Sequence, residues 1–321
     1  MEQQNNRKNF LFKFLASESS GIIITIVIML VAFAFIIPNF FRPANFLNIL
    51  IAGSLMGLVA IGESMLIIAG HFDLSPGAVS AFSGVMVAIL LNNGVNAFLA
   101  IIIVLAMGML VGLTNATLVN KLKFQPFIAT LATASVVRGL AYTVNKGNSE
   151  PVYNKSILVL GVGRFLGIPI PVWFLLIVTV FFLVVLKYTR FGRNIYLIGD
   201  NPTAARLSGI NAEAISTALY MILSSLTALG GILLASRMNT GTPLASQGLE
   251  FDGITAAILG GIAFTGGIGN LTGTVLGIFI LQGFTNGLLI MNMPSYWQFV
   301  ARGVILVVAL SFDHLRNILR K

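Results

Sequence analysis

Residues 97–119 read AFLAIIIVLAMGMLVGLTNATLV, a run that contains no charged side chain. A helix needs roughly 20 apolar residues to cross a hydrocarbon core of about 30 Å, and this run supplies them. Similar runs recur along the whole chain. Ten spans are predicted, at residues 21–37, 47–69, 74–91, 97–119, 124–143, 170–188, 214–236, 251–265, 272–290 and 296–312.

The composition indicates that lipid is the solvent of this chain. Of 321 residues, 57% are hydrophobic and only 9% are charged, whereas soluble domains carry about 25% charged residues. Unpaired backbone groups are costly in lipid, and runs this long lack the alternation of barrel strands. The sequence therefore predicts an all-α integral membrane protein with about ten transmembrane helices.

The basic residues predict the orientation. Ten spans place both termini on one side, and most of the 19 Lys and Arg residues fall on that side, which is the cytoplasmic side by the positive-inside rule. We expect a cytoplasmic N-terminal segment at 1–20, one transmembrane domain at 21–312 and a cytoplasmic tail at 313–321. The first span lacks a small-residue cleavage pattern, so we expect it to remain as a helix.

Two loops are long enough to form structure of their own. Residues 145–169, outside, are rich in Gly and Pro, and we expect an irregular cap. Residues 189–213, inside, are polar. There Asn201 can cap a short helix that starts at Pro202, and Gly209 can end it. Such a helix suits the docking of a soluble partner, and a plain connector is the alternative.

The sequence offers little for catalysis. The P-loop pattern and the Gly-x-Ser-x-Gly and His-Glu-x-x-His patterns are absent, and the chain has no cysteine and two histidines. The basic residues form no dense block that would favour nucleic acid. We therefore predict no enzyme activity, cofactor or metal site in this chain.

Several polar groups lie in or beside the predicted spans. Ionisable residues there are functional candidates because a charge in lipid is costly, and pairing between helices is the alternative. They are Glu63, Asp73, Arg138, Asp252 and Arg302. Residues 71–77, HFDLSPG, predict a helix end or break, and breaks commonly line translocation sites. A weaker echo, GNLTG, occurs at 269–273.

We predict a translocation pathway lined by polar side chains, because a neutral polyhydroxylated solute needs hydrogen-bonding groups more than charges. Hydrogen bonding between helices is the competing explanation. The candidates are Asp73, Ser75, Asn115, Gln282 and Asn286.

A series of short segments resembles the ribose-type permeases of ABC importers. They are GHFDLSPG at 70–77, FIATL at 127–131, GDNPTAARLSGI at 199–210, DGITAA at 252–257 and GGIG at 266–269. They occur in the family's order, and the resemblance extends from about residue 38 to the C-terminus. This chain has Asp200 where the family usually has glycine, and His71 where it usually has a small or aliphatic residue.

The resemblance implies a ten-helix permease that works as a dimer with an ATP-binding subunit and an extracellular or periplasmic solute-binding protein. It implies a bacterial plasma membrane location and import of a small sugar by alternating access. The coupling residues implied at the ATPase are Arg193, Gly199, Asn201, Ala204, Ala205, Arg206, Leu207, Ser208 and Gly209. The alternative is an ion-coupled secondary transporter that uses Glu63 and Asp73. The sequence does not determine which sugar is carried, or whether the dimer is a homodimer or a heterodimer.

Overall fold

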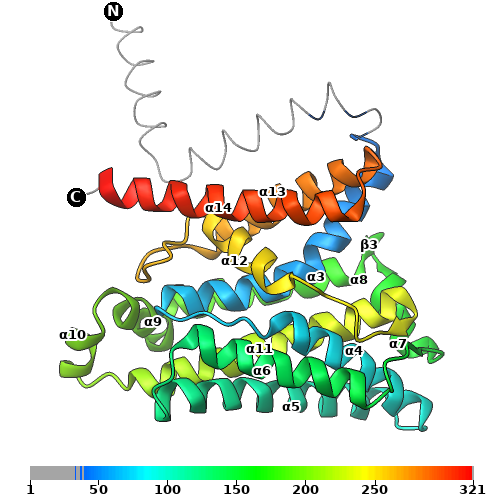
Figure 1. Cartoon of the computed structure of the whole chain (residues 1–321), viewed down its shortest axis with the longest axis horizontal. Helices are drawn as coiled ribbons and strands as arrows, with labels where there is room; N and C mark the ends of the chain where they lie inside the picture. The colour runs from blue at the N-terminus through cyan, green and yellow to red at the C-terminus, as the bar shows by residue number, and fades with distance from the viewer. Residues whose placement is uncertain (1–32, 34–36, 38–39, 320–321) are drawn as a thin grey trace, which may run out of the picture.

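The computed structural model describes residues 33, 37 and 40–319, with side chains placed as far as residue 311. The predicted segment 1–20 and almost all of the first span lie outside the described residues. The long helices lie side by side along one common direction (Figure 1). The helices are α3 (Pro43–Ile68), α4 (Pro76–Asn92), α5 (Ala97–Ala116) with the π-helical turn η1 (Thr117–Lys121), α6 (Pro126–Thr143), α7 (Lys155–Val162), α8 (Ile170–Tyr188), α9 (Arg190–Asp200), α10 (Pro202–Leu207), α11 (Ala212–Met238), α12 (Leu249–Leu259), α13 (Leu271–Ile290) and α14 (Ser295–Leu319).

The predicted membrane class is confirmed in outline. Among the described residues, five helices are long and apolar enough to cross a membrane, namely α3, α5 with η1, α8, α11 and α13. Helix α4 and residues 295–311 of α14 are apolar but shorter. The count of ten spans and the orientation of the termini stay predictions.

The predicted bounds of one span are wrong. Residues 251–265 do not form one continuous helix, because α12 has 11 residues and ends at Leu259. At 1.5 Å per residue it covers about 16 Å, roughly half of the hydrocarbon core. Gly261 and Gly266 follow with φ angles of +88° and +89°, a conformation that no right-handed helix contains. The glycines, which apolar composition alone ignores, end the helix early.

Helix α11 is the centre of the packing. It contacts α5, α4 and α3 over long stretches, and its Leu219, Tyr220 and Leu223 side chains are fully buried. Helices α9 and α10 lie at one end of the molecule, whereas α7 and β3 lie at the other (Figure 1). We call these the α10 end and the far end.

The prediction of an irregular cap at 145–169 is also wrong. At the far end, β1 (Glu150–Pro151) pairs with β4 (Thr240–Gly241), and β2 (Arg164–Phe165) pairs with β3 (Ile168–Pro169). Between them, Asn154 caps α7 by accepting a hydrogen bond from Ser156 N at 3.0 Å. Helix capping and strand pairing therefore give regular structure to a loop whose Gly and Pro content had predicted an irregular one.

Candidate functional site

The predicted short helix on the inner loop is present with its predicted bounds. Asn201 Oδ1 accepts a hydrogen bond from Ala204 N at 2.9 Å, and Pro202 occupies the first helical position. Helix α10 then ends at Leu207, and Gly209 adopts a φ of +79°. A left-handed residue here satisfies the last carbonyls, since Gly209 N donates to Arg206 O at 3.1 Å.

Helix α10 presents an unusual surface. Its Ala205 is 4% exposed, whereas the neighbouring Leu207 is 84% exposed. Arg206, Ala204 and Ser208 are exposed as well. Helix α10 therefore exposes a leucine next to a guanidinium group on a short polar helix.

Helix α9 was missed by the sequence reasoning. It is amphipathic, burying Ile195 and Ile198 while Arg193 is exposed. Thr189 caps its start, because its hydroxyl accepts a hydrogen bond from Gly192 N at 3.1 Å. The signal was available in the Thr cap and in the spacing of three between the isoleucines.

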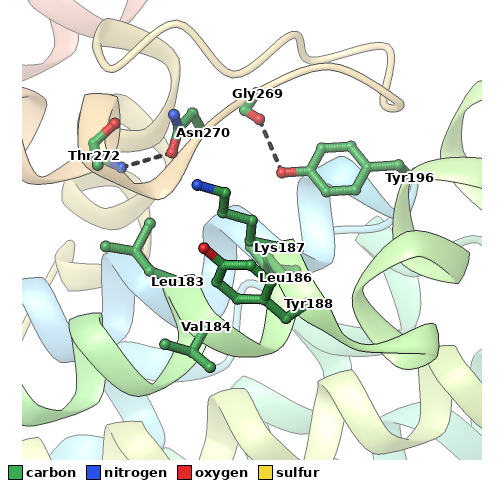
Figure 2. Close-up of a pocket in the computed structure, with 9 residues that line it drawn as sticks. All are labelled: Leu183, Val184, Leu186, Lys187, Tyr188, Tyr196, Gly269, Asn270 and Thr272. Carbon is green, nitrogen blue, oxygen red and sulfur yellow. Dashed lines mark hydrogen bonds between the residues drawn. The ribbon is translucent and has the colours of Figure 1, made fainter.

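Helix α9 sits directly on two other segments of backbone. A Cβ atom added at Gly199 would lie 1.8 Å from Ile68 O at the end of α3 and 2.7 Å from Gly267 N. Gly267 N donates to Ile68 O at 2.8 Å. Figure 2 shows the third link, in which Tyr196 Oη donates to Gly269 O at 3.0 Å.

These contacts define what we call the glycine junction, formed by Ile68, Tyr196, Gly199, Gly267 and Gly269. It joins α9 to the end of α3 and to the segment that leads into α13. Only glycine at residue 199 permits this approach, because backbone atoms lie on both sides. Asp200, the departure from the family pattern, lies against Gly267. Helix α9 therefore contacts both the end of α3 and the segment that leads into α13.

Three of the predicted pathway residues form one buried cluster at the break between α3 and α4. Asn115 Nδ2 donates to Asp73 Oδ2 at 2.8 Å and to Ser75 Oγ at 2.9 Å. Asp73 Oδ1 accepts from Ser75 N at 2.7 Å, and Glu63 Oε1 accepts from Asp73 N at 3.0 Å. All four side chains are at most 1% exposed. In this conformation the cluster fixes the break.

The echo of this break at 269–273 has a structural counterpart. Asn270 Oδ1 accepts a hydrogen bond from Thr272 N at 3.0 Å, two residues on, as Asp73 does from Ser75 N. Each turn leads into a helix, α13 and α4 respectively. The short sequence match therefore corresponds to the same type of side-chain-to-backbone hydrogen bond, although Asn270 is the N-cap of α13 and Asp73 lies two residues before Ser75, the N-cap of α4.

Gln282 and Asn286 lie apart from this cluster, on α13. Gln282 Nε2 contacts Met56 Sδ at 3.2 Å. The buried Asn286 Oδ1 has no hydrogen-bond partner among the described residues. No hydrogen bond within that part of the chain joins either residue to the Asp73 cluster, so the five predicted pathway residues form at least two groups.

The remaining charged candidates have partners. Arg302 Nη1 lies 3.1 Å from Asp252 Oδ2 and joins α14 to α12. Arg138 donates to Pro243 O and Ala245 O, both at 2.8 Å. Pairing between helices, the alternative left open by the sequence, accounts for Asp252 and Arg302. Arg138 instead binds backbone carbonyls of the segment between β4 and α12.

Comparison with known proteins identifies the family. Residues 45–310 match the family described as the permease component of branched-chain amino acid transport systems. The chain belongs to this family. It is 36% identical to the ribose import permease protein of Bacillus subtilis (strain 168) over 301 residues, which are 92% of this chain and 93% of that protein.

Two further relatives cover similar shares. The L-arabinose ABC transporter permease protein of Azospirillum brasilense is 33% identical over 298 residues, 93% of this chain and 88% of that protein. The ribose import permease protein of Escherichia coli (strain K12) is 35% identical over 320 residues, 98% of each. No solved structure matches the chain. The predicted permease function is confirmed and is favoured over the ion-coupled alternative.

Proposed function

We propose that the chain is the membrane-spanning subunit of an ATP-driven ABC importer for a small sugar, a ribose-like monosaccharide. The observation that carries this proposal is the similarity, over 92–98% of the chain, to permeases named for ribose and L-arabinose. The protein then resides in the plasma membrane of a bacterium, and both termini lie in the cytoplasm.

The proposed docking surface for the ATP-binding subunit is centred on α10. Burying a fully exposed leucine contributes about 1.5–3 kcal/mol, and Leu207 is 84% exposed. The exposed Arg206 supplies a charge that an acidic group of the ATPase can pair. Arg193 on α9 extends the same basic surface toward the membrane.

The far end is the proposed docking surface for the solute-binding protein. Both small sheets and α7 lie there, which gives a folded surface in place of a mobile loop. A second permease copy, identical or related, completes the transporter. We assign residues 21–312 to one transmembrane domain with a cytoplasmic coupling loop at 189–213.

The proposed mechanism is alternating access. When ATP closes the partner domains, α10 moves with the ATPase, and α9 moves with it because Asn201 alone separates the two helices. The glycine junction transmits this movement to α3 and to the start of α13. The permease makes no covalent change to the sugar, and the different affinity of ATP for the two arrangements supplies the drive.

Uptake of radiolabelled ribose and L-arabinose by cells with and without the chain tests the proposal. We expect uptake that stops when ATP is depleted and persists when an ionophore collapses ion gradients while ATP is maintained. Uptake that survives ATP depletion but stops with the ionophore would establish the ion-coupled alternative instead.

A further inference from the structure

A groove of about 560 Å³ opens at the α10 end of the molecule, beside the glycine junction. The last two turns of α8, Tyr196 of α9 and residues 269–272 before and at the start of α13 form its sides (Figure 2). Helix α8 contributes an apolar part, Leu183, Val184 and Leu186, together with Lys187 and Tyr188. We call this the interfacial groove.

The polar side of the interfacial groove is cationic. Figure 2 shows Lys187 extending from α8 toward Asn270 and Thr272. Its ammonium nitrogen lies 5.2 Å from the centroid of the Tyr188 ring. Among the side chains that the structure describes, the lining includes Lys187 and no Asp or Glu, so this part of the chain gives the groove one positive charge and several hydrogen-bonding groups without a carboxylate.

An apolar stripe leads along α8 into this groove. The exposed residues recur at spacings of three and four, which places them on one helix face. They are Ile177, Val180, Phe181, Val184 and Tyr188, each at least 50% exposed. Helix α8 is long and apolar enough to cross a membrane, and the stripe runs along its exposed face to the lysine at its end.

We propose that the interfacial groove binds the headgroup of an anionic phospholipid, with the acyl chains lying along the α8 stripe. A phosphate fits beside the Lys187 ammonium, and Tyr188, Asn270 and Thr272 supply hydrogen bonds to phosphate or glycerol oxygens. Tyrosine at the end of a span is typical of the membrane interface. The proposal requires only that the chain is embedded in lipid, so it stands apart from the nature of the transported solute.

A single engineered cysteine makes the site measurable, because the chain contains none of its own. Val184→Cys places a fluorophore at the groove in full-length permease reconstituted in bilayers. Brominated phosphatidylglycerol and brominated phosphatidylcholine are then compared as quenchers, each diluted into the unbrominated zwitterionic lipid. We expect phosphatidylglycerol to quench more strongly at equal mole fraction.

Two charge variants test whether Lys187 causes the preference for phosphatidylglycerol. Adding Lys187→Gln should weaken the association of phosphatidylglycerol about fivefold, the loss expected of one lysine near an anionic surface. Lys121→Gln, which removes an exposed lysine on η1 outside the groove, should leave the preference unchanged. A preference that survives Lys187→Gln, or is lost equally in both variants, overturns the proposal.

The remaining outcomes separate other occupants. Equal quenching by the two lipids means that the groove does not select an anion. Absence of quenching by either lipid means that protein, such as a second permease copy, covers the groove. Relief of quenching by millimolar inorganic phosphate means that the groove is a soluble-anion site. Each of these three results overturns the lipid assignment, whether or not the chain transports sugar.

Discussion

Substitution of Gly199 by alanine is the sharpest perturbation of the glycine junction. The added Cβ would lie 1.8 Å from Ile68 O and 2.7 Å from Gly267 N, whereas heavy atoms in ordinary contact are about 3.5 Å apart or more. Because both neighbours are backbone atoms, no side chain can rotate away. The three segments must separate by roughly 1.5 Å.

The cost follows from three contributions. Overpacking of this kind costs about 1–3 kcal/mol, and we take the upper end because the clash is with backbone. Separation also weakens the hydrogen bond from Gly267 N to Ile68 O, which is 2.8 Å long and contributes about 1 kcal/mol. The greater helix propensity of alanine offsets about 1 kcal/mol. The expected loss of stability is about 3 kcal/mol.

Gly139→Ala is the matched control. Gly139 lies within α6, and an added Cβ there meets nothing within 4 Å. It gains the same helix propensity without a clash, so we expect unchanged or slightly higher stability. Both variants carry a fluorescent tag and are heated in mild detergent, and the folded fraction is followed by size-exclusion chromatography.

We expect the unfolding midpoint of Gly199→Ala to fall by several degrees and its sugar uptake to drop, while Gly139→Ala behaves as the unmodified permease. Equal midpoints and equal uptake in the two variants would refute the tight junction. A lower midpoint with full uptake would show that the junction stabilises α9 but does not transmit its movement.

Three further predictions concern separate contacts. Arg206→Glu should abolish uptake while the folded permease remains in the membrane at normal levels, and normal uptake would remove the coupling assignment. Asn115→Ala should destabilise the fold by about 2–3 kcal/mol, because it removes two buried hydrogen bonds at the break between α3 and α4; the exposed substitution Asn93→Ala should cost far less, and equal midpoints on heating would contradict the cluster. A double-mutant cycle on Asp252→Ala and Arg302→Ala should give a coupling of about 1–3 kcal/mol, and additive effects would show that this 3.1 Å pair contributes little.

Local signals in the sequence predicted the short helix α10 well. Three features define this helix: the cap at Asn201, the proline in the first turn and the stop at Gly209. They lie within a few residues of one another, so they can be predicted without knowledge of the tertiary structure. The bounds of α8 and most of α11 followed equally from uninterrupted apolar runs. These features depend on short-range chemistry alone.

The errors arose where distant segments decide the structure. The run at 251–265 is apolar enough for a span, yet its helix ends at Leu259 because glycines there allow close backbone contact, such as that of Gly260 with Gly273. Asn115 is 40 and 42 residues away from the two side chains it binds. Their contact follows from the packing of α5 against α4, which no spacing rule provides.

Helix α9 shows the same limit in another form. The sequence predicted a polar loop here, because only three residues of the helix are buried. They are Gly192, Ile195 and Ile198. This face is buried because it packs against the end of α3 and residues 266–269, which are distant in the sequence. The glycine junction could therefore be predicted as a cluster of small residues, but its role in joining α9 to two helices required the fold.

Purification of the tagged permease from its native membrane in mild detergent, followed by mass spectrometry of the proteins that accompany it, tests the central claim most directly. We predict a stoichiometric P-loop ATPase that is retained by the unmodified chain and lost on Leu207→Ser, with the permease itself still folded. A clean permease without any ATPase, still able to move sugar into liposomes along an ion gradient, would contradict the assignment to an ATP-driven importer.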